Sequence, residues 1–167
     1  MERKNKSLGP DHIALIPDGN RRWAKKKGFI QSFSFWGASF DNLTKRPKTE
    51  VKFLYKVFHR QFSKALKDKR VHQNKVKVNV FGRWQEIFPN ETQKLIKELI
   101  EKTKNYNKNF LTFLLAYNGT DEMLSCIKEI SKKRIKNITA KTIKNHLWTK
   151  DLPPVDLVIR TGCEGDP

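Results

Sequence analysis

The sequence predicts an α/β domain whose central, mainly parallel sheet is flanked by helices. Five short apolar or β-rich runs alternate with segments of helical periodicity; they read HIALI (12–16), FSFWGA (33–38), VKVNVFG (76–82), FLTFLLAY (110–117) and VDLVIRT (155–161). This alternation is typical of βαβ units, whose strands run parallel. The length of 167 residues fits one domain with one core, so we expect a single active site.

The helical segments between these runs carry apolar residues three and four positions apart. The clearest extends from Pro47 to about Lys69, and Pro47 suits a first helical turn. A second covers Glu91 to Lys104 and a third begins near Thr120. A shorter fourth helix is expected after Thr139, whose hydroxyl makes it a good N-cap.

The charge is strongly positive, with 35 Lys and Arg against 17 Asp and Glu and a net charge of +18. Such a surplus favours polyanionic partners, namely nucleic acid, phosphorylated metabolites or an anionic membrane surface, but does not choose among them. A generally lysine-rich composition would produce the same excess. The choice therefore depends on individual arginines.

The remaining bulk features indicate a cytoplasmic protein. Cys126 and Cys163 have neither disulfide-framework nor zinc-ligand spacing. No apolar stretch approaches the ~20 residues of a membrane-spanning helix, and the first residues lack the apolar centre of a signal peptide. A basic face leaves peripheral contact with a membrane open.

Polar residues follow every predicted strand. In parallel α/β sheets ligands bind beyond the carboxyl ends of the strands, so these residues are expected to form one site. In chain order they are Asp18-Gly19-Asn20, then Ser39 with Asp41-Asn42 and Arg46, Gly82-Arg83, Asn118-Gly119 and Arg160-Thr161-Gly162.

The first of these groups indicates a phosphate site with a metal ion. Gly19 permits a tight turn, and the N–H groups of a helix beginning at Arg21 or Arg22 would bind a phosphate. A carboxylate beside a phosphate requires a bridging cation, so we predict Mg²⁺ between Asp18 and a diphosphate. The alternative is an Asp N-cap followed by solvated arginines.

Recurrence of arginine strengthens the phosphate interpretation. Arg22, Arg46 and Arg160 each follow a different strand, and a guanidinium binds phosphate oxygens in a bidentate manner. Ser39 and Asn42 would donate neutral hydrogen bonds to the same oxygens. Arg46 taken alone could also be a surface residue flanking a helix. The four histidines show no metal-ligand spacing, and the common nucleotide-binding glycine loops are absent from the sequence.

Taken together, the motifs resemble those of the cis-prenyltransferases, the isoprenyl diphosphate synthases of the undecaprenyl and dehydrodolichyl diphosphate synthase type. HIALIPDGNRRWAKKKG (12–28) resembles the family's first signature, a strand ending in Asp-Gly-Asn followed by arginine and an aromatic residue. Four further segments match in the family's order: ASFDNLTKRPKTEV (38–51), FGRWQEIFP (81–89), LLAYNGTDEM (114–123) and LPPVDLVIRTGCEGDP (152–167).

The resemblance implies a cis-prenyltransferase fold and a specific reaction. Family members use Mg²⁺ to condense isopentenyl diphosphate onto an allylic diphosphate, which forms a Z double bond and releases diphosphate. By resemblance, Asp18 is the metal-associated catalytic carboxylate and Asn42 takes part in proton removal. The substrate-binding residues implied in the same way are Gly19, Asn20, Arg21, Arg22, Trp23, Ser39, Arg46 and Arg160, of which Arg160 holds isopentenyl diphosphate.

Two departures from the family pattern concern the extent of the domain. After Gly28 the family continues with a Gly-His-x-x-Gly segment and a helix, whereas FIQSFSFWGASF follows here almost directly. The family also continues beyond the position of Pro167 with phosphate-binding residues, a metal-binding glutamate and much of the homodimer interface. We therefore expect residues 1–167 to form a single, incomplete cis-prenyltransferase domain.

The sequence thus predicts a polyprenyl diphosphate synthase that binds no nucleic acid. The competing hypothesis is a non-catalytic partner or remnant that binds diphosphate lipids. A basic RNA-binding protein is a third hypothesis, and it would require base-stacking aromatic residues interleaved with the charges.

Overall fold

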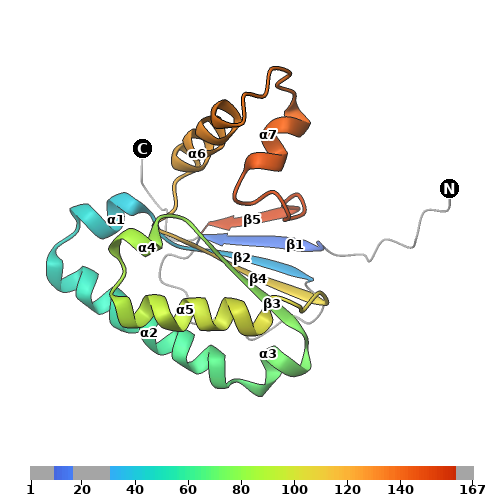
Figure 1. Cartoon of the computed structure of the whole chain (residues 1–167). Helices are drawn as coiled ribbons and strands as arrows, with labels where there is room; N and C mark the ends of the chain where they lie inside the picture. The colour runs from blue at the N-terminus through green and yellow to red at the C-terminus, as the bar shows by residue number, and fades with distance from the viewer. Residues whose placement is uncertain (1–9, 17–30, 161–167) are drawn as a thin grey trace.

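A five-stranded parallel sheet forms the centre of the molecule (Figure 1). The structure is a computed structural model and describes residues 10–16 and 31–160. The strands are β1 (His12–Ile16), β2 (Ser32–Ala38), β3 (Val76–Phe81), β4 (Asn109–Leu115) and β5 (Leu157–Arg160), in the spatial order β3-β4-β2-β1-β5. All four neighbouring pairs are parallel, which confirms the predicted fold class.

Seven helices accompany the sheet in the described ranges. They are α1 (Phe40–Lys45), α2 (Lys48–Lys67), α3 (Lys69–Gln73), α4 (Trp84–Ile87), α5 (Asn90–Thr103), α6 (Gly119–Lys132) and α7 (Ala140–His146). Figure 1 shows α2, α3 and α5 on one side of the sheet and α6 and α7 on the other. No helix within the described ranges is both long and apolar enough to cross a lipid bilayer.

The main core lies between the sheet and the pair α2 and α5. Phe58 and Phe62 of α2 pack with Ile96 and Leu99 of α5 against β3, which contributes Val78 and Val80, and β4. Phe62 is 2% exposed and its ring meets Phe113 of β4 edge-on at 5.1 Å. Burying one such ring stabilises the fold by roughly 2 kcal/mol, so the apolar stripe of α2 fixes the helix on the sheet.

The predicted long elements are confirmed within a few residues. β1 has the predicted bounds, α2 ends at Lys67 instead of about Lys69, and Thr139 is the N-cap of α7. The side chain of Asp68 accepts a hydrogen bond from the Arg70 backbone N–H at 2.9 Å and begins α3. The helical pattern near Lys69 therefore belongs to two helices.

A tight contact between the ends of β3 and β4 requires glycine. Gly82 follows β3 and has a φ of +112°, and a Cβ placed there would lie 2.1 Å from the backbone oxygen of Leu115. The next residue, Arg83, donates its backbone N–H to the oxygen of Ala116 at 3.1 Å. The loops that follow these two strands are thereby held together at the carboxyl edge of the sheet.

Candidate functional site

The carboxyl ends of all five strands lie at one edge of the sheet because every neighbouring pair is parallel. This edge places Ser39, Asn42 and Arg46 after β2, Asn118 after β4 and Arg160 at the end of β5. The group Asp18, Gly19, Asn20, Arg21, Arg22 and Trp23 lies outside the described residues, as does Thr161. The roles of these residues therefore remain predictions.

Ser39 and Asn42 are held together by the first turn of α1. Ser39 is the N-cap of this helix, and its Oγ accepts a hydrogen bond from the Asn42 backbone N–H at 3.0 Å. Leu43, 5% exposed, anchors the same short helix in the core. The cap therefore sets the direction in which α1 leaves β2, and with it the position of Asn42 at the sheet edge.

A cavity of about 530 Å³ opens at this edge. Ser39, Asn118 and Gly119 line it at the strand ends, together with Ala14, Leu15, Ser34, Trp36, Leu114, Tyr117 and Val158. The backbone N–H of Tyr117 reaches the Ala38 oxygen at 3.3 Å, which joins the ends of β4 and β2. The cavity therefore combines polar groups from two strand ends with apolar walls.

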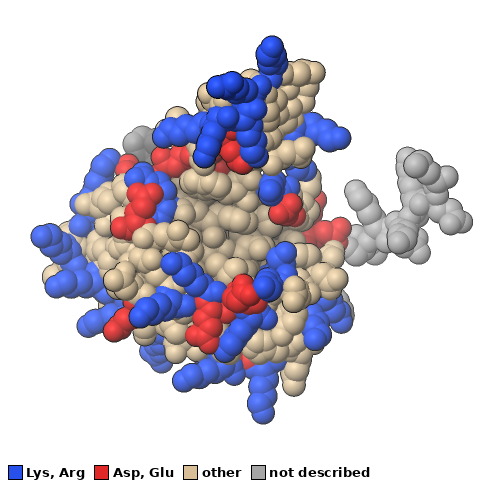
Figure 2. Space-filling view, viewed as in Figure 1, with Lys and Arg blue, Asp and Glu red and all other residues tan. Residues whose placement is uncertain are grey.

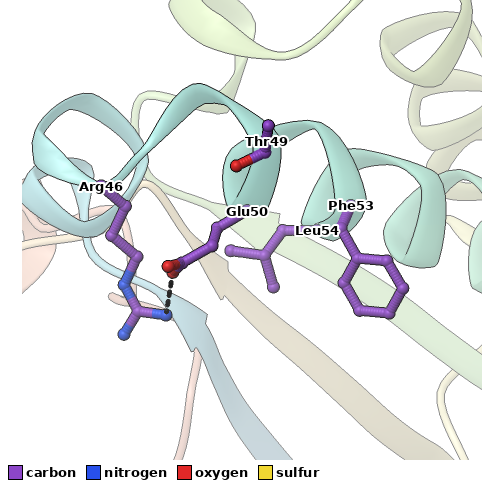
Figure 3. A pocket seen from close by; sticks show the side chains of 5 residues that line it. All are labelled: Arg46, Thr49, Glu50, Phe53 and Leu54. Carbon is purple, nitrogen blue, oxygen red and sulfur yellow. Dashed lines mark ion pairs between the residues drawn. The ribbon is translucent and has the colours of Figure 1, made fainter.

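Arg46 lies beside a separate hollow of about 380 Å³ at the start of α2 (Figure 3). Thr49, Glu50, Phe53 and Leu54 complete its lining. The guanidinium is 3.9 Å from the Glu50 carboxylate, and both side chains are about half exposed. Exposed ion pairs of this geometry contribute little to stability, so Arg46 retains most of its capacity to bind an anion.

Arg160 lies next to the end of β1. It pairs in register with Ile16, and Asp18 follows Ile16 by two positions in the sequence. Arg160 is exposed and forms no ion pair with a described residue. The sheet register therefore brings Ile16, the last residue of β1, and Arg160 to neighbouring strand ends.

Arg83 differs from these two arginines because its charge is already engaged. Its guanidinium is 2.7 Å from Glu86 and 3.6 Å from Asp121 of α6, and it lies over the Phe40 ring at 3.9 Å. The hydrogen bonds between the Arg83 and Glu86 side chains raise the pKa of Arg83 and lower the pKa of the Glu86 carboxyl. Arg83 therefore joins α1, α4 and α6 at the sheet edge.

Two buried polar networks that the sequence did not reveal support the cavity walls. His12, 1% exposed, contacts the Ser34 hydroxyl through Nε2 at 2.8 Å and the Pro153 oxygen through Nδ1 at 3.0 Å. Glu122 of α6, 5% exposed, accepts hydrogen bonds from Tyr117 and from the backbone and hydroxyl of Thr149. Burial, followed by the bond to Glu122, raises the pKa of Tyr117.

The described residues do not supply a set of ligands for Mg²⁺. No group of three or more His, Cys, Asp or Glu side chains within the described ranges could hold a metal ion. Three carboxylates that follow the strands in sequence are paired with cations, Asp41 with Lys45, Glu50 with Arg46 and Asp121 with Arg83. The predicted metal site therefore depends on Asp18, which is outside the described residues.

Comparison with known proteins identifies relatives over most of this chain. Residues 29–165 match the family model described as putative undecaprenyl diphosphate synthase. A Pyrococcus horikoshii protein named tritrans,polycis-undecaprenyl-diphosphate synthase (geranylgeranyl-diphosphate specific) is 32% identical, over 98% of this chain and 73% of its own. A protein of the same name from Pyrobaculum aerophilum is 33% identical, over 93% of this chain and 76% of its own.

Solved structures share the fold. Lavandulyl diphosphate synthase from Lavandula x intermedia, crystallised with dimethylallyl diphosphate, matches with a TM-score of 0.80 and 23% identity over 94% of this chain and 79% of its own. A probable undecaprenyl diphosphate synthase from Campylobacter jejuni gives a TM-score of 0.76 at 23% identity, over 96% of this chain and 78% of its own.

The alignment lengths bear on the predicted internal deletion. The match to the Pyrococcus horikoshii protein extends over 194 residues, although this chain has 167 in total. Within the aligned region the relative therefore has residues without a counterpart here. This difference agrees with an internal deletion.

Proposed function

The chain belongs to the undecaprenyl diphosphate synthase family of cis-prenyltransferases, and we propose that it condenses isopentenyl diphosphate with an allylic diphosphate to form a Z-polyprenyl diphosphate. The proposal is supported by the order of elements: Ser39, Asn42 and Arg46 follow β2 and Arg160 ends β5, and the carboxyl ends of these parallel strands and of β1 lie at one edge of the sheet. These are the described positions at which the sequence matches the family's substrate-binding and catalytic motifs.

Two diphosphates need separate cationic partners. We assign Arg46 to the allylic diphosphate and Arg160 to isopentenyl diphosphate. The two arginines lie at the ends of different strands, and neither forms a close ion pair with a described residue. Departure of diphosphate from the allylic substrate leaves a carbocation, and guanidinium groups stabilise the negative charge that develops on the leaving group.

The polar groups at the end of β2 act on the reacting carbons. The cap between Ser39 and the Asn42 backbone holds these two residues in fixed register. Asn42 would assist removal of the proton that is lost when the new bond forms, and Ser39 would hydrogen-bond a substrate oxygen. Positioning of this kind lowers the entropic part of the barrier because the groups are already in place.

The preferred allylic substrate is geranylgeranyl diphosphate. This assignment is supported by the names of the two archaeal relatives, both geranylgeranyl-diphosphate specific and about one third identical to this chain. Mg²⁺, held by Asp18, would supply Lewis-acid stabilisation of the diphosphate. A homodimer is expected from the family resemblance, and light scattering of the purified protein tests it.

The alignment lengths support a second candidate function, binding of diphosphate lipids without catalysis. Because the relatives contain residues without a counterpart here, the chain could bind diphosphate lipids without condensing them. An allylic cation must be shielded from water, and fewer residues are available to enclose it.

One experiment separates the two functions. The purified chain is incubated with Mg²⁺, geranylgeranyl diphosphate and labelled isopentenyl diphosphate, and the label in extracted polyprenyl products is counted. If the chain is a synthase, it incorporates the label, and Asn42→Ala abolishes this incorporation. The control is Asn105→Ala, an exposed change before β4, which should leave incorporation intact. A ligand-induced rise in melting temperature without incorporation supports binding alone, and absence of both contradicts both functions.

A further inference from the structure

The two faces of α2 differ sharply in chemical character. Val51, Phe58 and Phe62 are buried against the core, and on a helix of 100° per residue they define its inner face. The opposite face is exposed and carries Lys52, Lys56, Arg60, Lys64, Lys67 and Phe53. We call these six residues the α2 basic face; they occupy an arc of about 120° and a length of about 22 Å along the helix axis.

The five cations of the α2 basic face have no close acidic partner among the described residues. None of them forms an ion pair there, although eight ion pairs occur in the described part of the chain. Of the two carboxylates nearest in sequence, Glu50 lies 3.9 Å from Arg46, and Asp68 forms its ion pair with Arg70 while Lys64 acts on it only at longer range. Figure 2 shows mainly basic side chains along the lower rim of the molecule, where Figure 1 places α2 and α3.

The other long helices do not share this pattern. α5 interleaves lysines with Glu91, Glu98 and Glu101, and α6 carries Asp121 and Glu129 beside its lysines. Pairs such as Lys102 with Glu98 and Lys133 with Glu129 neutralise these surfaces locally. The charge on α2 is therefore a feature of one helix face and not only of the overall composition.

An exposed aromatic ring accompanies the cations. Phe53 is 64% exposed, and Figure 3 shows its ring projecting from α2 beside the hollow that contains Arg46. Leaving such a ring in water is unfavourable, and transfer to an apolar environment recovers free energy in proportion to the area removed from water.

We propose that the α2 basic face binds the surface of an anionic lipid bilayer, with the five cations at the headgroups and Phe53 inserted at the acyl boundary. Clusters of four to eight Lys or Arg on an amphipathic helix are attracted to anionic lipids, and an aromatic side chain adds apolar anchoring. A straight helix face matches a planar surface along its whole length.

A lipid surface fits better than a nucleic acid. Single-stranded nucleic acid is bound by several aromatic side chains that stack with successive bases, whereas Phe53 is the one aromatic residue of the α2 basic face. The product of the proposed function is itself a lipid, so this choice rests partly on that function. The test below measures vesicle binding without substrate and is independent of catalysis.

The experiment is co-sedimentation with vesicles of phosphatidylcholine alone or with 30% phosphatidylglycerol, a composition chosen for the assay at low salt. Each basic residue near an anionic surface is worth about a fivefold change in affinity. The triple variant Lys52→Glu, Lys56→Glu, Arg60→Glu should therefore bind the anionic vesicles at least ~100-fold more weakly. Phe53→Ser should weaken binding roughly tenfold.

Matched control variants distinguish vesicle binding that depends on the α2 basic face from binding that depends only on the net charge. Lys94→Glu, Lys128→Glu and Lys141→Glu are exposed changes on α5, α6 and α7 that alter the net charge equally, and their triple variant should retain most of the binding. Leu124→Ser, at another exposed apolar residue, is the control for Phe53→Ser. Circular dichroism verifies that every variant is folded.

Three results would overturn the proposal. They are equal losses in the two triple variants, equal binding to neutral and anionic vesicles, and absence of vesicle binding by the unaltered chain. Anisotropy with a labelled single-stranded RNA tests the competing partner. Tighter binding to RNA than to anionic vesicles, lost selectively in the α2 triple variant, would assign the face to nucleic acid instead.

Discussion

Replacing Gly82 by alanine should destabilise the protein strongly. The residue has a φ of +112°, and holding a non-glycine residue in such a region costs about 1–3 kcal/mol. The new Cβ would also lie 2.1 Å from the Leu115 oxygen, where ordinary contacts begin at about 3.4 Å. Because that oxygen belongs to the backbone of β4, relief requires movement of a strand end, which also threatens the 3.1 Å hydrogen bond from Arg83 to Ala116.

The total expected loss in the free energy of unfolding is about 3 kcal/mol, from backbone strain together with one weakened hydrogen bond. With a urea m-value of about 2 kcal/mol per M, the unfolding midpoint should fall by about 1.5 M. The melting temperature should fall by about 6–12 °C for a chain of this size.

Gly119→Ala is the matched control for urea unfolding followed by circular dichroism. A Cβ at Gly119, the first residue of α6, would have nothing within 4 Å, so this variant should lie within about 0.5 kcal/mol of the parent protein. Equal stabilities of the Gly82→Ala and Gly119→Ala variants would refute the reasoning, because the two positions would then impose the same backbone requirement.

The remaining predictions concern the site and its supports. Ser39→Ala should destabilise by about 1 kcal/mol through loss of the cap, and label incorporation should fall by more than this loss of stability explains if the cap positions Asn42. Arg160→Lys should weaken isopentenyl diphosphate binding in a calorimetric titration because an ammonium cannot reproduce the guanidinium fork; unchanged affinity would make Arg160 part of the general basic surface. Glu122→Gln should cost about 1–3 kcal/mol in urea unfolding because the glutamine oxygen can still accept from Thr149 but its amide nitrogen cannot accept from the Tyr117 hydroxyl, and a neutral outcome would show that the network is dispensable. Bonds from Arg70 lower the pKa of Asp68 to about 2, so the stabilisation it provides is present above about pH 4, the range of an unperturbed Asp, and is lost as the pH falls toward 2. The stability difference between the parent protein and Asp68→Asn should shrink over that interval, and a constant difference would contradict the assignment.

The sequence predicted the long elements of the fold because their formation depends on local periodicity. The α2 pattern of apolar residues is that of a helix buried on one side, and the strands are bounded by turn residues. The short helices α1, α3 and α4 were not predicted. Each has four to six residues, too few to show a period, and α1 depends on the Ser39 cap and on burial of Leu43.

The sequence predicted only the part of the candidate site that follows from one rule, that ligands bind beyond the carboxyl ends of parallel strands. That rule placed Ser39, Asn42 and Arg160 at one edge from the order of elements. It gave no indication that His12 would contact Ser34, because that contact depends on the register between β1 and β2. The sequence did not single out Glu122, since its partner Thr149 lies 27 positions away.

The structure separates arginines that the sequence pattern treats as equivalent. Arg46 and Arg83 come after strands and Arg160 ends one, so all three satisfy the sequence criterion for a phosphate ligand. Arg83 has two carboxylates and an aromatic ring as partners, and moving it to a ligand would leave Asp121 and Glu86 without their cation. Arg46 has one loose partner, and Arg160 has no ion-pair partner among the described residues. The cost of recruiting an arginine to a diphosphate is the loss of its existing contacts. Of these three arginines, Arg46 and Arg160 therefore keep their charge available to an anion, and Arg83 maintains the edge of the sheet.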